Sequence, residues 1–338
     1  MSDLLAGLLA ALVATNTPPA ISNQPPQKSS LSAPVPDPND PVEKEFLKLE
    51  AEDDAAVEAA EKLSDAAGAA ALAGDPQLQL SLHIHIKERL DPVKKDYEDF
   101  LRLHPDYVRA RLAYGSFLND SGDEEGALVQ WEKASQLAPN NPVAWNDLAN
   151  YYEENNVKKS FEYFTKAITL DPTQPLYYHN MAICVYLFRT DAEDYWKCTE
   201  QETFDLTLAL YRKAMKLDPT NFILASDYAE CFYGIRPPRL QEGLDAWNKC
   251  LKIAHDEIER EGVYIHLARL QLALNHFDES RRDLDVVTNK MYSVLKTNLM
   301  HNLDLAIQRS LTNAPAATIR NPQSAIRNPS TNAPSEAH

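Results

Sequence analysis

One short pattern recurs four times between Val93 and Pro219, and it constrains the fold more than any other feature of this chain. Each copy has a small or β-branched residue, an aromatic residue, a further small or aromatic residue and a closing proline. The copies are Val93, Tyr97, Phe100 and Pro105; Ala127, Trp131, Ala134 and Pro139; Ser160, Phe164, Ala167 and Pro172; and Thr207, Tyr211, Ala214 and Pro219. Self-similarity with a period in the thirties predicts a stacked array of helical hairpins, which presents an extended binding surface.

A second pattern lies in the first helix expected for each hairpin, where a small residue follows a larger one. The series are Arg111, Tyr114, Gly115 and Leu118; Trp145, Leu148, Ala149 and Tyr152; Tyr178, Met181, Ala182 and Val185; Ala225, Tyr228, Ala229 and Phe232; and Tyr264, Leu267, Ala268 and Gln271. Small residues allow helix backbones to approach, and the aromatic residues fill the space between hairpins. In this order the units resemble tetratricopeptide repeats over residues 74–288, most clearly over 108–141 and 142–174.

The resemblance implies an all-α fold, a right-handed superhelical α-solenoid of about five hairpins. A degenerate N-terminal hairpin would precede the repeats, and a C-terminal capping helix up to residue 311 would cover the last one, since open solenoid ends need caps. The proline after each second helix stops that helix because proline cannot continue its hydrogen-bond ladder.

Two insertions depart from the regular period. Phe164 and Tyr211 stand too far apart for one repeat, and Thr190–Glu193 and Thr199–Glu202 have the spacing of capping boxes. We therefore predict a short extra helix over 191–197 and a long second helix over 200–217. A smaller excursion is expected at 235–240, which holds Pro237 and Pro238.

The remaining segments divide the chain further. Residues 1–40 combine a short apolar segment with a proline-rich linker that we expect to be disordered. Residues 41–73 form an Ala/Glu-rich helical segment, 74–311 the repeat domain with its cap, and 312–338 a disordered tail. Within 77–86, large aliphatic residues alternate with polar ones as in a strand. We predict a helix there, because Asp75-Pro76 is a helix start and the chain offers no second strand to pair with.

The apolar run Leu4–Val13 is too short to span a bilayer. Asp3 stands where a signal peptide carries basic residues. We expect a short helix and a cytoplasmic protein; the alternative is the apolar core of a cleaved signal, which would make the protein exported. As a helix, the run could dock onto the chain's own repeats.

Charge and motif content exclude several function classes. A net charge of −17 disfavours nucleic-acid binding, which needs clustered Lys and Arg. No phosphate-binding loop, nucleophile motif or metal-ligand spacing is present, and the four cysteines have no CxxC pair. We expect no enzyme, no cofactor and no metal, and we keep an unrecognised enzyme as a remote alternative.

The favoured function is a non-catalytic protein-interaction scaffold. The alternative is a secreted or envelope-anchored accessory protein of the same family. In the family, the first helices line a concave, peptide-binding groove. The matching positions here are Leu112, Ser116, Asn119, Asn146, Asn150, Glu153, His179, Ile183, Tyr186, Ser226, Glu230, Tyr233 and Arg269.

Asn146 and Asn150 can hydrogen-bond an extended peptide backbone. Glu153 and Glu230 indicate a ligand with some basic character. Some members of the family grip a C-terminal carboxylate with basic and amide side chains, but the positions concerned hold Leu112, Ser116, Asp147 and Asn180. The identity of the protein partner and the oligomeric state are left open.

Overall fold

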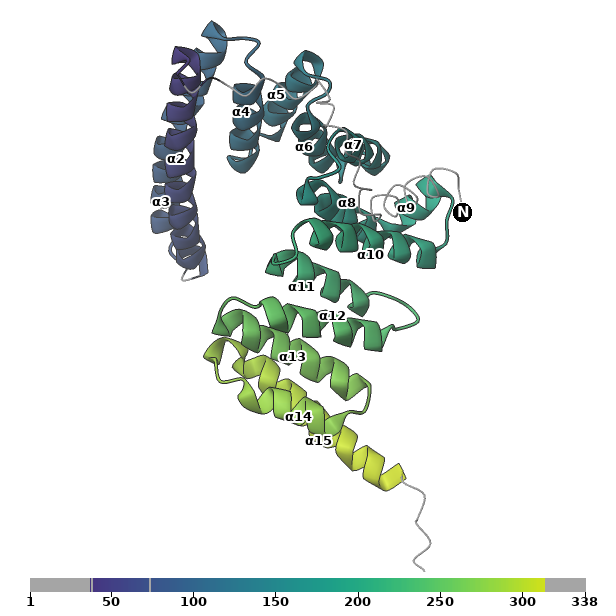
Figure 1. Cartoon of the computed structure of the whole chain (residues 1–338). Coiled ribbons are helices and arrows are strands. Elements are labelled where there is room, and N and C mark those ends of the chain that lie inside the picture. The colour runs from purple at the N-terminus through teal and green to yellow at the C-terminus, as the bar shows by residue number, and fades with distance from the viewer. Residues whose placement is uncertain (1–36, 38, 73, 314–338) are drawn as a thin grey trace, which may run out of the picture. The chain divides into compact units, whose positions relative to one another are not determined.

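The computed structural model describes residues 37, 39–72 and 74–313 (Figure 1). All regular elements within these residues are helices, which confirms the all-α prediction. The expectations for the leading apolar segment, the linker and the C-terminal tail concern residues outside this range. The chain forms two compact units that divide after Arg239, and we describe each by itself.

The N-terminal unit opens with a long antiparallel pair, α2 (Pro41–Leu72) and α3 (Pro76–Leu103). The Asp75 side chain caps α3 by accepting a 3.0 Å hydrogen bond from the Leu78 amide. Residues 77–86 are therefore helical as predicted, despite their alternating pattern. Helix α3 continues without interruption through Pro92.

The leading hairpin is built differently from the expectation that it would lie inside residues 74–311. Residues 76–103 form one helix, and its partner is the preceding α2. Phe46 and Tyr97 are fully buried between the two helices, and the Tyr97 hydroxyl donates a 2.6 Å hydrogen bond to Asp53. The Ala/Glu-rich segment is thus part of the fold.

The start of α2 also differs in detail. Asp40 accepts a 2.9 Å hydrogen bond from the Val42 amide, as a helix cap should. Asp40 and Glu43 have the spacing of a capping box, but Glu43 is buried and accepts hydrogen bonds from the Tyr107 hydroxyl and the Arg109 guanidinium. Glu43 therefore fastens α2 to the first regular repeat.

Three regular hairpins follow in this unit, and their helices lie side by side in Figure 1. They are α4 (Val108–Asp120) with α5 (Glu124–Leu137), α6 (Pro142–Tyr152) with α7 (Val157–Leu170), and α8 (Pro175–Leu187) with α10 (Glu200–Leu217); α11 (Phe222–Glu230) and the short 3₁₀ helix η1 (Cys231–Tyr233) come next. Each second helix ends two residues before its closing proline, as the sequence predicted.

The contact between Gly115 and Trp131 shows why the first helix of a repeat needs a small residue at this position. A β-carbon built on Gly115 would meet three atoms of the buried Trp131 indole at less than 3.0 Å. The equivalent Ala149, Ala182 and Ala229 have no exposed surface. Small residues on the first helix therefore let the hairpins close around the aromatic residues.

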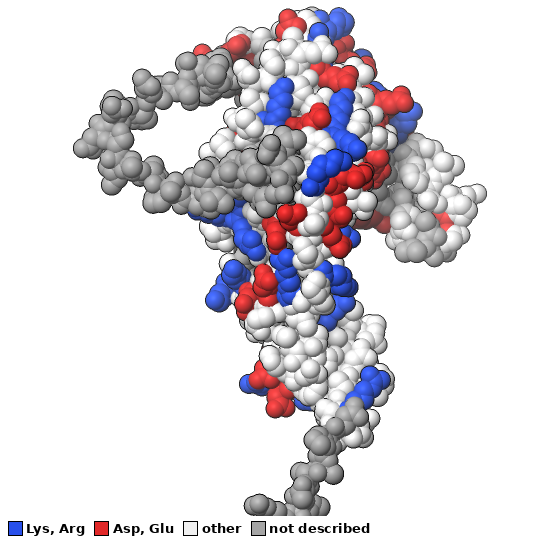
Figure 2. Space-filling model, turned by 90° about the vertical axis from the view of Figure 1, so that its right-hand side faces the viewer, with Lys and Arg blue, Asp and Glu red and all other residues white. Residues whose placement is uncertain are grey.

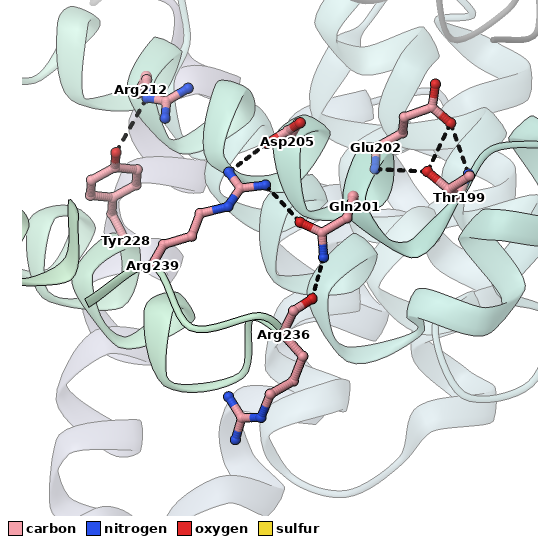
Figure 3. Close-up of polar contacts among 8 residues, drawn as sticks. All are labelled: Thr199, Gln201, Glu202, Asp205, Arg212, Tyr228, Arg236 and Arg239. Carbon is pink, nitrogen blue, oxygen red and sulfur yellow. Dashed lines mark hydrogen bonds and ion pairs between the residues drawn. The ribbon is translucent and has the colours of Figure 1, made fainter. Parts of the chain in front are cut away.

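The first insertion folds as predicted. Helix α9 (Arg189–Trp196) is the extra helix, and its Trp196 ring packs 4.7 Å from the Phe161 ring. The long α10 begins with a complete capping box between Thr199 and Glu202 (Figure 3). The proposed Thr190–Glu193 box is wrong, because α9 starts two residues earlier than predicted, and its N-cap residue, Phe188, makes no side-chain hydrogen bond to the helix.

The second insertion, residues 234–239, is held against α10. Arg239 donates to Asp205 at 2.6 Å and to Gln201 at 2.9 Å, and Gln201 donates in turn to the backbone carbonyl of Arg236 (Figure 3). Polar contacts on both sides of Pro237-Pro238 thus anchor this loop to the N-terminal unit.

The C-terminal unit consists of α12 (Leu240–Ile253), α13 (Glu257–Ala273), α14 (Phe277–Val286), the 3₁₀ helix η2 (Lys290–Tyr292) and α15 (Ser293–Asn313). Leu303 of α15 is fully buried against a cluster that contains Ile265 and Leu284. Helix α15 therefore covers the α13–α14 hairpin, as the capping prediction required. Within the described residues, no helix is both long and apolar enough to cross a bilayer.

Candidate functional site

A polar pocket of the N-terminal unit lies where α4, α5 and α6 meet, and it has a volume of about 380 Å³. Five carboxylates, three asparagines and two aromatic rings face it, and none of its lining residues is basic. The lining residues are Ser116, Asn119, Asp120, Glu124, Trp131, Asp147, Asn150, Tyr151, Glu153, Glu154 and Asn155.

The turn between α4 and α5 forms one wall. Gly122 adopts φ +84°, a backbone conformation that suits glycine and allows a tight reversal after α4. Asp123 then caps α5 by accepting a 3.0 Å hydrogen bond from the Gly126 amide, and Lys94 of α3 binds the same carboxylate at 2.9 Å. These contacts fix the turn that lies between Asp120 and Glu124.

Another wall is formed by α6 and the turn that follows it, where two carboxyl groups have raised pKa values. Burial raises the pKa of Asp147 to about 7, and the Asn146 side chain, which donates a 3.3 Å hydrogen bond, only partly offsets this rise. Burial and, to a lesser degree, the neighbouring Glu154 raise the pKa of Glu153 to about 7 as well. Removing water from a carboxylate penalises its charged form, so both groups gain from a cation.

Four of the predicted groove residues meet in this pocket: Ser116, Asn119, Asn150 and Glu153. The other carboxylates, Asp120, Glu124 and Glu154, come from the ends of the helices, where the repeat pattern assigns no ligand-facing position. Their signal in the sequence is the recurrence of acidic residues directly after the first helix in two successive repeats.

The prediction that Asn146 faces a ligand is wrong. Its side chain is only 3% exposed, and its carbonyl oxygen accepts a 3.1 Å hydrogen bond from Asn180 of α8. Asn146 and Asn150 share a face of α6, but α8 covers the position of Asn146. The amide pair predicted to hold a peptide backbone is therefore reduced to Asn150, which is exposed.

The prediction that Leu112 lines the groove is also wrong, because its side chain lies in the hydrophobic core and is only 8% exposed. In the first repeat, α2 packs against α4, so the side chain one position after Arg111 faces the core formed with this hairpin.

A second group of predicted residues lies around α8 and α11. His179 Nε2 is 2.7 Å from Asp227 Oδ2, which joins the two helices. Tyr186 stacks with the Arg189 guanidinium at 5.0 Å, and its hydroxyl leaves no room for a β-carbon at Gly234. His179 and Tyr186 are thus engaged in the packing of successive hairpins.

The other predicted residues differ in their accessibility. Ile183, Ser226 and Tyr233 are half-buried, and the Ser226 hydroxyl donates to the Ile223 carbonyl. Glu230 is exposed, and its pKa is raised by partial burial and by Asp227. Arg269 is exposed on α13 and belongs to the C-terminal unit.

Charge is mixed on the face drawn in Figure 2, where acidic and basic side chains alternate. The carboxylates that line the pocket have no basic residue among them. They would repel the carboxylate of a C-terminal peptide, which agrees with the absence of lysines from the inward positions. Among the residues that the structure describes, no group of three or more His, Cys, Asp or Glu side chains is placed to hold a metal ion.

Comparison with known proteins identifies one of these helical hairpins. The family model described as "Tetratricopeptide repeat" matches residues 144–174, which comprise nearly all of α6 and α7 together with the closing proline. Residues 144–174 therefore match a tetratricopeptide repeat. No curated protein sequence matches it.

Several solved structures are similar to this chain. The structure of PilW, described as a widely conserved type IV pilus biogenesis factor, aligns with a TM-score of 0.50 and 16% identity, over 66% of this chain and 96% of PilW. YrrB, described as a TPR protein with an unusual peptide-binding site, aligns with a TM-score of 0.44 and 12% identity, over 64% and 97% of the two chains. MamA aligns with a TM-score of 0.40 and 18% identity, over 50% and 91%. At 16% identity the likeness to PilW concerns the fold alone. The repeat matched at residues 144–174 supports a protein-interaction scaffold in general.

Proposed function

We propose that this protein is a non-catalytic scaffold that binds an extended, basic segment of a partner protein, with the α4–α6 pocket as a main contact. The observation that carries the proposal is the composition of the pocket, in which five carboxylates and three asparagine amides converge without a basic residue. An arginine or lysine side chain supplies the missing charge.

The electrostatics of the pocket support a cationic ligand. Asp147 and Glu153 are held in surroundings that disfavour their charged forms. A guanidinium placed between them would restore a counter-charge, and a charge-assisted hydrogen bond contributes about 1.5–3 kcal/mol. Arginine suits the site better than lysine because its planar fork can bind a carboxylate with two parallel hydrogen bonds.

The size of the pocket supports a side chain rather than a whole folded partner. A volume of about 380 Å³ lies at the lower end of the range for ligand pockets. Asn119 and Asn150 are exposed at its edges, and an amide offers both a donor and an acceptor to a peptide backbone. An extended segment could insert one basic side chain here and continue along the first helices, toward the exposed Glu230.

Fluorescence anisotropy with two labelled peptides tests the proposal. One is an extended peptide of Gly and Ser that carries several arginines, and in the other glutamates replace the arginines. We expect the arginine peptide to bind and the glutamate peptide not to bind. Replacing Asp147 and Glu153 together by Asn and Gln should weaken binding about tenfold or more, the equivalent of 1.4 kcal/mol.

The matched control is Glu162→Gln, which removes one charge from an exposed position on α7 outside the pocket. It should leave the affinity almost unchanged. Equal binding of both peptides, or equal losses in the control and in the double variant, would reject the pocket as a site for basic segments.

As an alternative, the protein could be an exported accessory protein that has the same scaffold but acts in another compartment. N-terminal sequencing of the native protein distinguishes the exported form from the cytoplasmic form. Loss of about the first twenty residues would favour the exported form, since signal peptides have about this length. A protein that begins at Met1 or Ser2 would favour the cytoplasmic form.

A further inference from the structure

The α2–α3 hairpin is much longer than the repeats that follow it. α2 and α3 contain 32 and 28 residues, whereas α4 and α5 contain 13 and 14. At 1.5 Å per residue, α2 measures about 48 Å and α4 about 20 Å. In Figure 1 the α2–α3 pair extends well past the end of α4. Roughly half of the hairpin therefore has no neighbour within the described part of this unit.

This protruding end carries large aliphatic side chains on more than one face. Leu82 and Ile86 are half-buried, but Leu78, Leu80 and Ile84 are 48%, 63% and 51% exposed. The alternating spacing is responsible, because residues two apart lie about 200° apart around a helix. A helix that is apolar on several faces is normally buried on several faces.

Shallow cavities mark where the contact with α4 ends. Two of them, of about 410 and 330 Å³, lie beside the last turn of α4, and both are lined by Ile86, Leu90 and Phe117. Val57 and Ala60 of α2 line the larger one. The apolar surface thus continues from the interior of the unit onto the protruding hairpin.

The exposed side of α2 complements this surface in size. Ala66, Gly68 and Ala69 are exposed, and a β-carbon built on Gly68 would meet nothing within 4 Å. A surface of such small residues allows a second helix to approach closely, so that Leu and Ile side chains can pack over it.

The charges complement each other as well. Glu61 and Asp65 are exposed on the outer half of α2, beside the Glu58–Lys62 ion pair, whereas Lys87 and Arg89 are exposed on α3 on either side of Glu88. A two-fold axis places the same surface of two copies face to face, so that α3 of each copy can meet α2 of the other. Large side chains would then meet small ones, and basic side chains would meet acidic ones, twice in one interface.

We propose that the protruding ends of α2 and α3 form a homodimer interface, in which the hairpins of two copies pack as a four-helix bundle. About fifteen residues of each helix give a face roughly 22 Å long, and two adjacent helices are about 20 Å wide. Such a face covers about 440 Å² on each copy, about 880 Å² in total, which is below the standard size of stable interfaces and typical of weak, transient ones. The dimer should therefore dissociate on dilution.

Sedimentation velocity of the full chain over a dilution series tests the interface. We expect a reversible monomer–dimer equilibrium. The double variant Leu80→Gln and Ile84→Gln should raise the dissociation constant at least tenfold, and its circular dichroism should stay that of the wild type because both side chains are already exposed. Leu187→Gln and Val129→Gln alter residues that are 61% and 60% exposed on other helices, and they should leave the dimer intact.

A charge exchange tests the proposed geometry. Arg89→Glu and Glu61→Arg should each weaken the dimer, and the combined variant should recover part of the loss. A chain that stays monomeric at every concentration, or a dimer insensitive to the Leu80/Ile84 variant, would overturn the proposal. A monomer that dimerises only after residues 1–14 are deleted would also overturn it, and would assign the surface to the chain's own leading apolar segment.

Discussion

Asp147→Asn is the most informative substitution that the structure suggests, because it should make the protein more stable and less able to bind. The Asp147 carboxyl is half-buried at the α4–α6 pocket, where burial raises its pKa from 3.8 to about 7. Asparagine has nearly the same shape, carries no charge, and can still accept the hydrogen bond from Asn146 through its own carbonyl oxygen.

The sign of the stability change follows from proton linkage. The folded protein holds a proton at Asp147 more tightly than the unfolded chain does, so folding is favoured by protonation of this group. The destabilisation by the charged form is complete above pH 7, shrinks as the pH falls from 7 toward 4, and vanishes below the unfolded pKa. Asparagine does not titrate, and the advantage of the variant should follow this course.

The magnitude has an upper bound from the size of the shift. A difference of about three pKa units, at 1.36 kcal/mol each, corresponds to about 4 kcal/mol. Part of the carboxyl remains accessible to water, so its desolvation is less complete than a shift of this size implies. After this discount we expect a gain of about 1–2 kcal/mol at pH 8.

Urea unfolding at pH 8 and at pH 4 measures the effect directly. We expect Asp147→Asn to raise the free energy of unfolding at pH 8 and to leave it almost unchanged at pH 4. Glu162→Gln is the control for removal of an exposed charge and should differ little from the wild type at either pH. No gain at pH 8, or a gain that does not shrink on acidification, would refute the reasoning about the buried carboxyl.

Binding separates the stability argument from the functional one. A residue retained at a cost to stability is a candidate for function, and Asp147→Asn should weaken the binding of the arginine peptide. A variant that is more stable but binds as well as the wild type would leave the electrostatics intact and remove Asp147 from the proposed ligand site.

Two further predictions concern the framework of the N-terminal unit. Gly115→Ala should lower the free energy of unfolding by about 1–3 kcal/mol, because the added methyl group overlaps the Trp131 indole; Gly68→Ala, at an open helical position, should instead raise it by about 0.5–1 kcal/mol. Glu43→Gln should lower the thermal midpoint at pH 7, because the hydrogen bond from Tyr107, the one from Arg109 and the positive charge of Arg109 keep the pKa of Glu43 below its usual value. The stability that this carboxylate contributes is present above its unfolded pKa and is lost as the pH falls through the folded pKa, so the variant and the wild type should converge in acid. A deficit of the Glu43 variant that persists at low pH would contradict this account.

Local patterns predicted much of the fold. The phased aromatic residues and prolines predicted where the second helices end, and the Thr199–Glu202 box predicted the start of α10 to the residue. These predictions succeed because capping, proline termination and helical periodicity act over a few neighbouring residues. The position of the capping helix α15 followed from the same periodicity.

The same local reasoning failed where a distant helix decides what a side chain meets. Asn146 and Asn150 are equivalent by spacing, yet α8 covers one and leaves the other exposed. Leu112 is buried in the core that α2 shares with the first repeat. Helix α2 itself pairs with α3, and the alanine-rich sequence of α2 contains no pattern that predicts this pairing.

The sequence by itself thus determined the helices, their ends and the repeat that stacks them. Only the tertiary structure decided which positions remain open to a ligand, and it gathered Asp120 of α4, Glu124 of α5 and Asp147 of α6 into one pocket. The physical reason is that a helix sets the direction of each side chain by its own geometry, whereas burial and pKa depend on whichever neighbours long-range packing brings to that side.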